Sequence, residues 1–312
     1  MRILIGFSLF GIAQKLVFKN ANWDGNSMLG ILFGLVAMLG YGISNSMSQV
    51  PIKAIGSKRT IFFRNATASA FLGLATLFFL SETTISAEYV LIALGIAFLG
   101  YLPQLAYFRA LKAGKVGVVS PIASSSVVFT VLFSLIFFNE VLGAWQVAAI
   151  ASIVLGVIFI SANPKDWKNT NLLNLSSGVP YALVAGVLWG LVYFLLKIPV
   201  SALGPMLSGF LLEFGGMVFS GINLKLSKVS FGIPDGGILQ KMIIIGLLGG
   251  MGTMFFNLGI QGSDVSIVAA ITFSWPMLAA IYAKYAYKEE MGLLQWAAAV
   301  LILAGIIVLS AG

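Results

Sequence analysis

Residues 116–162 read VGVVSPIASSSVVFTVLFSLIFFNEVLGAWQVAAIASIVLGVIFISA, and residues 265–311 read VSIVAAITFSWPMLAAIYAKYAYKEEMGLLQWAAAVLILAGIIVLSA. Laid over each other without a gap, at an offset of 149, the two stretches are identical at 14 of 47 positions. The identities include polar and small residues, which apolar composition alone does not explain: Glu140 and Glu289, Gly143 and Gly292, Gln146 and Gln295, Gly156 and Gly305, and Ser161 and Ser310. The chain therefore contains an internal repeat.

The repeat extends toward the N-terminus. At an offset of 148, residues 34–56 align with residues 182–204, so that Pro51 pairs with Pro199 and Gly56 with Gly204. The near equality of the two offsets indicates a duplication rather than a chance likeness of apolar segments. We divide the chain into an N-terminal segment (1–27), a first repeat (28–162), a linker (163–177) and a second repeat (178–312). Arg2 precedes an apolar run that is short for a membrane span, so the N-terminal segment fits a cleaved signal, a signal anchor or an interfacial helix.

Composition places both repeats in a membrane. Of the 312 residues, 59% are hydrophobic and 9% are charged, and the mean hydropathy is +1.02. A water-soluble core cannot cover that much apolar surface, whereas a bilayer accepts apolar helices of roughly 20 residues. The sequence predicts an all-α integral, multi-pass membrane protein, located in the cytoplasmic membrane if the source is prokaryotic. Its ten transmembrane helices are expected at residues 29–51, 59–80, 89–108, 116–138, 144–162, 178–198, 204–224, 240–260, 265–287 and 292–311.

Each repeat holds five predicted helices, which is an odd number. The second repeat must therefore enter the membrane from the opposite side, and the predicted fold is a pair of inverted five-helix repeats. This architecture recurs in secondary transporters, which bind their solute near the middle of the bilayer where the repeats meet. Channels also contain inverted repeats, so the pattern favours transport without defining its mode.

Missing residue types exclude several classes of chemistry. The chain has no cysteine and no histidine, which excludes thiol nucleophiles, disulfides, histidine bases and Cys/His zinc sites. It also lacks the Gly-x-x-x-x-Gly-Lys-Ser/Thr loop that binds nucleotides. We therefore expect a protein that is not an enzyme and uses no cofactor and no metal. The net charge of +8 is spread over short connections, which fits the positive-inside rule and not nucleic-acid binding.

The repeated motif resembles the EamA type of the drug/metabolite transporter superfamily. In that family each repeat ends with an acidic residue, a Gln six positions later and a Gly about ten positions beyond, as at Glu140, Gln146 and Gly156. The turn ALKAG at residues 110–114 is similar to the end of the family's third helix. Over residues 29–311 the resemblance implies a ten-helix transporter. It leaves the substrate open, because members carry amino acids, drugs, nucleobases and other metabolites.

Two charged residues stand out because insertion of a charge into a bilayer costs about 2.5–3.5 kcal/mol. Glu213 is the carboxylate nearest the middle of the membrane, and the offset of 148 places Arg64 opposite Leu212, beside Glu213. On the functional interpretation, Glu213 binds a cationic group or a coupling proton, and Arg64 attracts a carboxylate or pairs with Glu213. On the structural interpretation, Arg64 extends to the membrane surface and Glu213 only bonds a neighbouring helix.

Polar and aromatic residues supply further candidates for solute binding. In the first helix, a polar stripe consisting of Tyr41, Ser44, Asn45, Ser48 and Gln49 must face either a cavity or another helix. In the sixth helix, the aromatic residues Trp189 and Tyr193 are four positions apart. They either clamp a planar or apolar solute or only pack against neighbouring helices. The predicted substrate-binding residues are Tyr41, Asn45, Ser48, Gln49, Arg64, Gln104, Trp189, Tyr193, Glu213, Asn257 and Trp275.

These observations predict a secondary active transporter that exports amino acids, related small metabolites or drugs by alternating access. Its partners are a small-molecule solute, the lipid bilayer and protons as the coupling ion, with Glu213 as the coupling residue, in a monomer or a homodimer. One alternative is a uniporter or exchanger of phosphorylated or nucleotide-linked sugars, which would need several cationic groups at mid-membrane. Another is a channel, which would need a water-lined path with a selectivity ring.

Overall fold

A computed structural model describes residues 27–79, 85–160, 174 and 177–311, and every element in these ranges is helical. Nine helical segments among them are long and apolar enough to cross a membrane, and a tenth, at residues 144–160, is apolar but shorter. The predicted all-helical membrane fold is therefore confirmed. Residues 1–26 and nearly all of the predicted linker lie outside the described residues.

The helices of the first repeat are α2 (Ser27–Met47), α3 (Gln49–Ile55), α4 (Ser57–Phe79), α5 (Ala87–Ala113), α6 (Val116–Ala123), α7 (Ser126–Phe137) and α8 (Ala144–Ile160). Those of the second repeat are α10 (Val179–Leu195), α11 (Lys197–Leu203), α12 (Pro205–Leu226), α13 (Gly236–Gly262), α14 (Val265–Thr272), α15 (Pro276–Ala286) and α16 (Leu293–Ala311).

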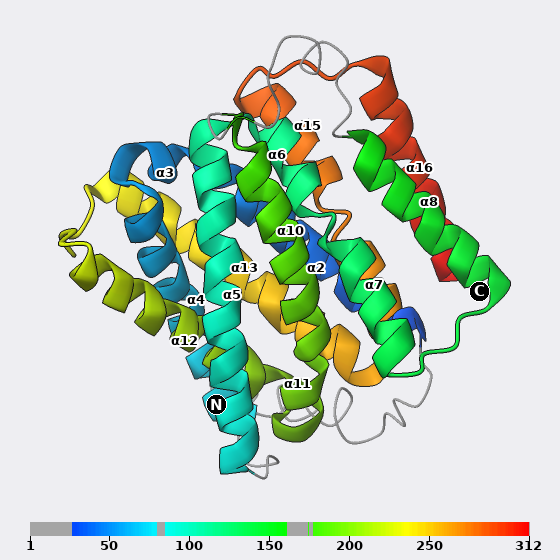
Figure 1. Ribbon diagram of the computed structural model, residues 1–312, viewed down its shortest axis with the longest axis horizontal. Helices are drawn as coiled ribbons and strands as arrows, with labels where there is room; N and C mark the ends of the chain where they lie inside the picture. Colours follow the sequence, from blue (N-terminus) through cyan, green and yellow to red (C-terminus); the bar gives the residue numbers. More distant parts are fainter. Residues whose placement is uncertain (1–26, 80–84, 161–173, 175–176, 312) are drawn as a thin grey trace, which may run out of the picture.

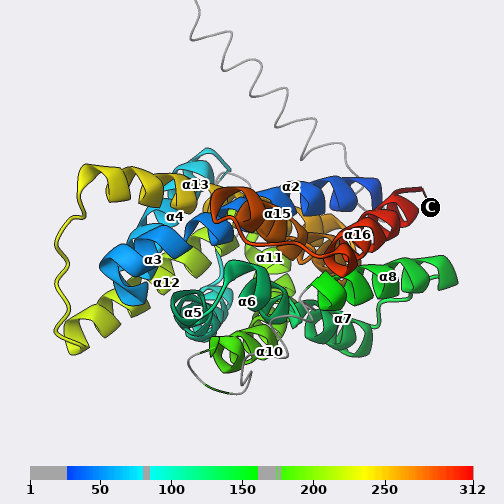
Figure 2. The same cartoon turned by 90° about the horizontal axis from the view of Figure 1, so that it is seen from above.

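The two repeats match element by element. The offset of 148 relates the starts of α3 and α11, and the offset of 149 relates both ends of α5 to those of α13. The matching short helices α3 and α11 lie at opposite ends of the bundle, as an inverted repeat requires (Figure 1). Seen from above, the elongated bundle has α4 and α12 toward one end and α8 and α16 at the other (Figure 2).

Four spans that the sequence predicted as continuous helices are interrupted, giving α2/α3, α6/α7, α10/α11 and α14/α15. Proline explains three of the interruptions. Pro51, Pro199 and Pro276 each lie four residues after the last residue of α2, α10 or α14, and a proline cannot donate the hydrogen bond that would continue the helix there. Three of the interruptions are thus encoded locally, and all four divide their spans into two helices each.

The glutamine of the repeated motif begins the last helix of each repeat. Gln146 Oε1 accepts a hydrogen bond from the Gly143 N–H at 2.7 Å, and Gln295 Oε1 accepts one from the Gly292 N–H at 2.9 Å. In each case the glutamine is the third residue of the helix, and its side chain bonds back to the residue that precedes the helix. This hydrogen bond satisfies one of the N–H groups that are free at a helix start.

The glycine of the motif lets α8 and α16 pack closely. A Cβ atom at Gly156 would lie 2.6 Å from Ile302 Cγ1 and 2.9 Å from the Ala298 carbonyl oxygen. A Cβ atom at Gly305 would lie 2.7 Å from the Ala149 carbonyl oxygen. All three distances are too short for a side chain, so the pair of glycines sets the approach of the two helices.

The acidic residue of the motif joins the repeats. Glu140 accepts hydrogen bonds from the backbone N–H groups of Val265 at 2.7 Å and Ser266 at 3.1 Å, at the start of α14. Burial raises the pKa of Glu140, although the hydrogen bonds from Ser266 and Val265 lower it. Glu140 is thus a cap on a helix of the other repeat, where a negative charge also meets the positive end of the helix dipole.

We expect Gly156→Ala to destabilise the protein by about 1–3 kcal/mol, because the added methyl group would push α8 away from α16. Gly95→Ala is the matched control, since nothing lies within 4 Å of a Cβ atom at Gly95 in α5. There the helix preference of alanine is expected to stabilise by about 0.5–1 kcal/mol. Thermal unfolding in detergent measures both, and equal shifts for the two variants would contradict the packing argument.

We expect Glu140→Ala to cost about 1–2 kcal/mol, as the loss of a helix cap does elsewhere, because two N–H groups of α14 lose their acceptor. Glu88→Ala removes an exposed carboxylate at the start of α5 and serves as the control. The melting temperatures of the two variants in the same detergent decide the matter. If they agree, the cap contributes nothing measurable.

Candidate functional site

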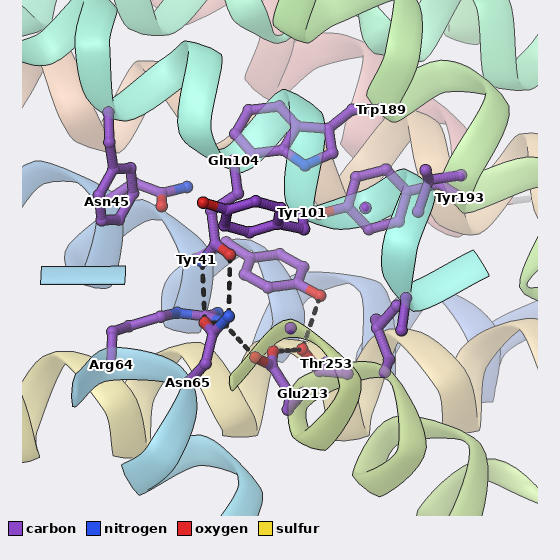
Figure 3. Close-up of a pocket in the computed structure, with 16 residues that line it drawn as sticks. Tyr41, Asn45, Arg64, Asn65, Tyr101, Gln104, Trp189, Tyr193, Glu213 and Thr253 are labelled. Carbon is purple, nitrogen blue, oxygen red and sulfur yellow. Dashed lines mark hydrogen bonds and ion pairs between the residues drawn. The ribbon is translucent and has the colours of Figure 1, made fainter. Parts of the chain in front are cut away.

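A cavity lies between the two repeats, with walls from α2, α4 and α5 of the first and α10, α12 and α13 of the second (Figure 3). Its volume is about 60 Å³, which is room for a few water molecules. The lining residues are Tyr41, Asn45, Arg64, Asn65, Ala97, Gly100, Tyr101, Gln104, Phe108, Trp189, Val192, Tyr193, Leu212, Glu213, Gly216 and Thr253.

Corresponding positions of the two repeats face each other across this cavity. Five pairs of its lining residues are related by the offsets of 148 and 149, namely Tyr41 and Trp189, Asn45 and Tyr193, Arg64 and Leu212, Asn65 and Glu213, and Gln104 and Thr253. The cavity therefore lies on the pseudo-two-fold axis that relates the repeats, which is where inverted-repeat transporters bind solutes.

An ion pair between Arg64 of α4 and Glu213 of α12 lies at this axis. Arg64 is 8% exposed and Glu213 is 4% exposed, so both charges are removed from solvent. The other carboxylate oxygen of Glu213, Oε1, accepts a hydrogen bond from the Thr253 hydroxyl at 2.8 Å. A Cβ atom at Gly249 would lie 2.5 Å from Arg64 Nη2, so this glycine of α13 makes room for the guanidinium group.

The first repeat supplies a neutral counterpart to this charged arrangement. Asn65 and Gln104 exchange two hydrogen bonds through their carboxamides, at 3.0 and 2.9 Å. Arg64 Nη1 also donates to Asn65 Oδ1, at 2.8 Å. Because Asn65 pairs with Glu213 in the repeat and Gln104 with Thr253, the contacts Asn65–Gln104 and Glu213–Thr253 are equivalent by symmetry. Arg64 bridges the two.

Aromatic rings form the rest of the wall. The ring centroids of Tyr41 and Tyr193 lie 6.2 Å apart, and Tyr193 packs on Phe256 at 5.2 Å. Trp189 borders the same space (Figure 3). The Tyr101 hydroxyl is buried and has no hydrogen-bond partner among the described residues, which is unusual for a buried hydroxyl. The cavity thus offers flat apolar surfaces and the hydroxyl group of Tyr101.

Seven of the predicted substrate-binding residues line the cavity: Tyr41, Asn45, Arg64, Gln104, Trp189, Tyr193 and Glu213. Of the polar stripe on the first helix, only Tyr41 and Asn45 line the cavity. Ser44 donates to the Ile245 carbonyl at 2.8 Å and Ser48 to the Ser44 carbonyl at 2.8 Å, so each hydroxyl bonds to helix backbone. The hydroxyl groups of both serines are therefore hydrogen-bonded within the protein.

The other three predicted residues also lie outside the lining. Gln49 Nε2 donates to the Gly114 carbonyl at 3.4 Å, just beyond the end of α5. Its repeat partner Lys197 donates in the same way to the Ser263 carbonyl at 3.3 Å, just beyond the end of α13. Both therefore cap C-terminal ends of helices, which attract positive or donor groups.

Asn257 Nδ2 donates to the Pro205 carbonyl at 3.0 Å, which joins α13 to the start of α12. The ring of Trp275 packs edge-on against Tyr107, with centroids 5.9 Å apart. Tyr107 in turn lies 5.1 Å from Trp189. Trp275 therefore supports the cavity wall from behind.

Three polar lining residues were absent from the prediction: Asn65, Tyr101 and Thr253. The sequence held a signal for two of them. Applying the repeat offsets to Glu213 and Gln104 leads directly to Asn65 and Thr253. No comparable signal marks Tyr101, because its repeat partner is Gly250. Among the described residues, no group of three or more His, Cys, Asp or Glu side chains could hold a metal ion.

Comparison with known proteins bears on this architecture. A solved crystal structure, titled "Crystal structure of protein", superposes with a TM-score of 0.71 at 18% identity, covering 90% of this chain and 96% of its own. At that identity the likeness shows the fold alone. No curated protein matches the sequence.

The EamA-like transporter family matches twice, at residues 28–162 and 176–311. The match covers most of the chain and repeats as the internal duplication does. With an inverted-repeat membrane fold and a polar cavity on its axis, the chain belongs to the EamA-like transporter family and is a membrane transporter of the drug/metabolite type.

Proposed function

We propose that the protein is a secondary active transporter that exports amino acids or closely related zwitterionic metabolites by alternating access. The observation that carries this proposal is the buried Arg64–Glu213 ion pair at the axis of a cavity with aromatic walls. Such a pair presents one positive and one negative group side by side, which is the complement of a zwitterion.

The energetics of the ion pair favour an exchange of partners. Burying two charges costs several kcal/mol per ion, and separating a buried pair without replacement is strongly unfavourable. A solute that supplies a carboxylate to Arg64 and an ammonium group to Glu213 replaces both halves of the pair at once. The cavity has room for a few water molecules only, so a larger solute must open the pair as it enters.

The neighbouring groups fit the rest of such a solute. The carboxamides of Asn65 and Gln104 can rearrange to hydrogen-bond its polar atoms. Tyr41, Tyr193 and Trp189 provide flat surfaces for an apolar or aromatic side chain, and the free hydroxyl of Tyr101 provides one more polar contact.

Charge balance argues against a phosphorylated solute. Recognition of a phosphate group typically uses several cationic donors, arginine above all. Among the residues that line the cavity, Arg64 is the one cation, and Glu213 already neutralises it. The alternative of a sugar-phosphate or nucleotide-sugar exchanger therefore has no supporting observation at this site.

Proton coupling follows from the same exchange. A solute that draws Arg64 to its carboxylate without bringing an ammonium group would leave Glu213 unpaired, and a proton bound there would remove the uncompensated buried charge. A solute ammonium group or a proton can therefore each satisfy Glu213. The interrupted spans α2/α3 and α10/α11 supply the joints about which residues 28–162 and 178–312 would move as two halves.

Glu213→Gln is expected to abolish accumulation of labelled amino acids against their gradient in proteoliposomes with a pH difference, because glutamine cannot take up a proton. Uptake and efflux of an amino-acid and nucleobase panel, with and without the pH difference, measure this. The control is Glu88→Gln, which makes the same substitution at an exposed residue. A change at Gln295 would not serve as a control, because Gln295 caps a helix. Saturable transport that ignores both pH and Glu213 would make the protein a facilitator.

Arg64→Gln and Glu213→Gln are each expected to destabilise the protein by about 3–5 kcal/mol, because each leaves a buried charge without its partner. The double variant should recover most of this loss while still failing to bind solute. Thermal unfolding in detergent and solute-induced thermal shifts separate the two effects. A double variant as unstable as the sum of the single ones would show that the pair is not coupled.

A further inference from the structure

Both oxygens of the Glu213 carboxylate are occupied, which raises the question of how a proton reaches it. One oxygen faces Arg64, and the other accepts the Thr253 hydroxyl at 2.8 Å. Glu213 is 4% exposed and Thr253 is 1% exposed. Arg64 and Thr253 therefore hold the two carboxylate oxygens that a proton would have to reach.

A directed chain of hydroxyl groups leads to the same carboxylate. The Tyr41 hydroxyl donates to Thr253 Oγ1 at 3.1 Å, so the Thr253 oxygen acts as the acceptor in that bond. Thr253 has a single hydroxyl hydrogen, which it directs to Glu213 at 2.8 Å or to the carbonyl of Gly249 at 3.2 Å. The dashed contacts in Figure 3 join these three side chains in the order Tyr41, Thr253, Glu213.

The backbone around the chain is shaped to hold it. A Cβ atom at Gly252 would lie 2.6 Å from the Tyr41 ring, so this glycine lets the ring approach α13 beside Thr253. Gly249 does the same for Arg64. Two glycines on one turn of α13 thus position the proton donor chain and the cation on either side of Glu213.

We propose that Tyr41 and Thr253 form a proton relay that loads and unloads Glu213, an inference that rests on the proton coupling of the proposed function. In one concerted step the carboxylate takes the Thr253 hydroxyl proton, Thr253 takes the Tyr41 proton, and Tyr41 takes a proton from a hydronium ion in the cavity. Three O–H bonds form and three break, and the hydronium ion becomes water. The reverse sequence releases the proton.

The relay gives Tyr41 and Thr253 a direct role in proton transfer, because each hydroxyl group accepts one proton and passes on another. Since Arg64 binds the oxygen of Glu213 that the relay does not use, protonation through Thr253 and release of Arg64 can proceed together. The neutral symmetry mate of this arrangement, Asn65 with Gln104, has no titratable group, so the relay has one destination.

The test uses the full chain in proteoliposomes with a pH-sensitive dye in the lumen and labelled solute, so that proton and solute flux are measured together. Tyr41→Phe and Thr253→Val keep the shape of each side chain and remove the relay hydroxyl. We expect both to slow proton-driven net transport roughly a hundredfold, the low end for a positioned proton-transfer group. Solute-for-solute exchange, which needs no net proton transfer, should slow far less in Thr253→Val. Thr253→Ser should restore coupled transport.

Tyr107→Phe is the matched control, because the Tyr107 hydroxyl bonds Ser120 at 2.8 Å and lies outside both the relay and the cavity lining. The native protein should also transport more slowly in deuterated water, and Tyr41→Phe should lose that difference. If Thr253→Val slows exchange and net transport equally, the relay is wrong while a proton-coupled native protein stands. If native transport itself ignores the pH difference, the relay and the proposed coupling both fail.

Discussion

The requirement that a charge inside hydrocarbon must meet an opposite charge organises the centre of this protein. Arg64 and Glu213 meet between α4 and α12, and neither could remain at that depth alone. Their contact in turn depends on the close approach of the α13 backbone to Arg64. At Gly249, the guanidinium group occupies the space that a side chain would need. Helix packing, the cavity and its electrostatics are therefore consequences of one constraint.

The duplication makes this centre symmetric in position and asymmetric in chemistry. Equivalent sites carry a carboxamide pair, Asn65 with Gln104, in one repeat and a carboxylate with a hydroxyl, Glu213 with Thr253, in the other. Gene duplication supplies the shared backbone geometry, and divergence of a few lining residues supplies the difference in chemistry between the two halves.

The repeated motif has a structural role and lies outside the lining of the cavity. Its glutamines begin α8 and α16, its glycines bring these two helices together, and Glu140 caps a helix of the opposite repeat. These contacts satisfy backbone groups that a bilayer leaves without water. The residues that identify the family are thus different from those that would determine its substrate, which explains why the family resemblance leaves the solute open.

The sequence by itself determined the membrane class, the helical fold and the inverted repeats, and it singled out Arg64 and Glu213 as charges within apolar spans. Apolar run length, a fixed offset and the cost of a buried charge are readable without coordinates. It also held the interruptions of three spans, in the positions of the prolines. Tertiary structure alone decided which polar residues line the cavity between the repeats. Ser48 and Gln49 belong to the same stripe as Tyr41, yet they bond to backbone carbonyls, while Tyr101 keeps a free hydroxyl that no pattern marked. Helical periodicity shows which residues share a face of a helix. Whether the polar groups on that face bond within the protein depends on which acceptors lie nearest in the folded structure.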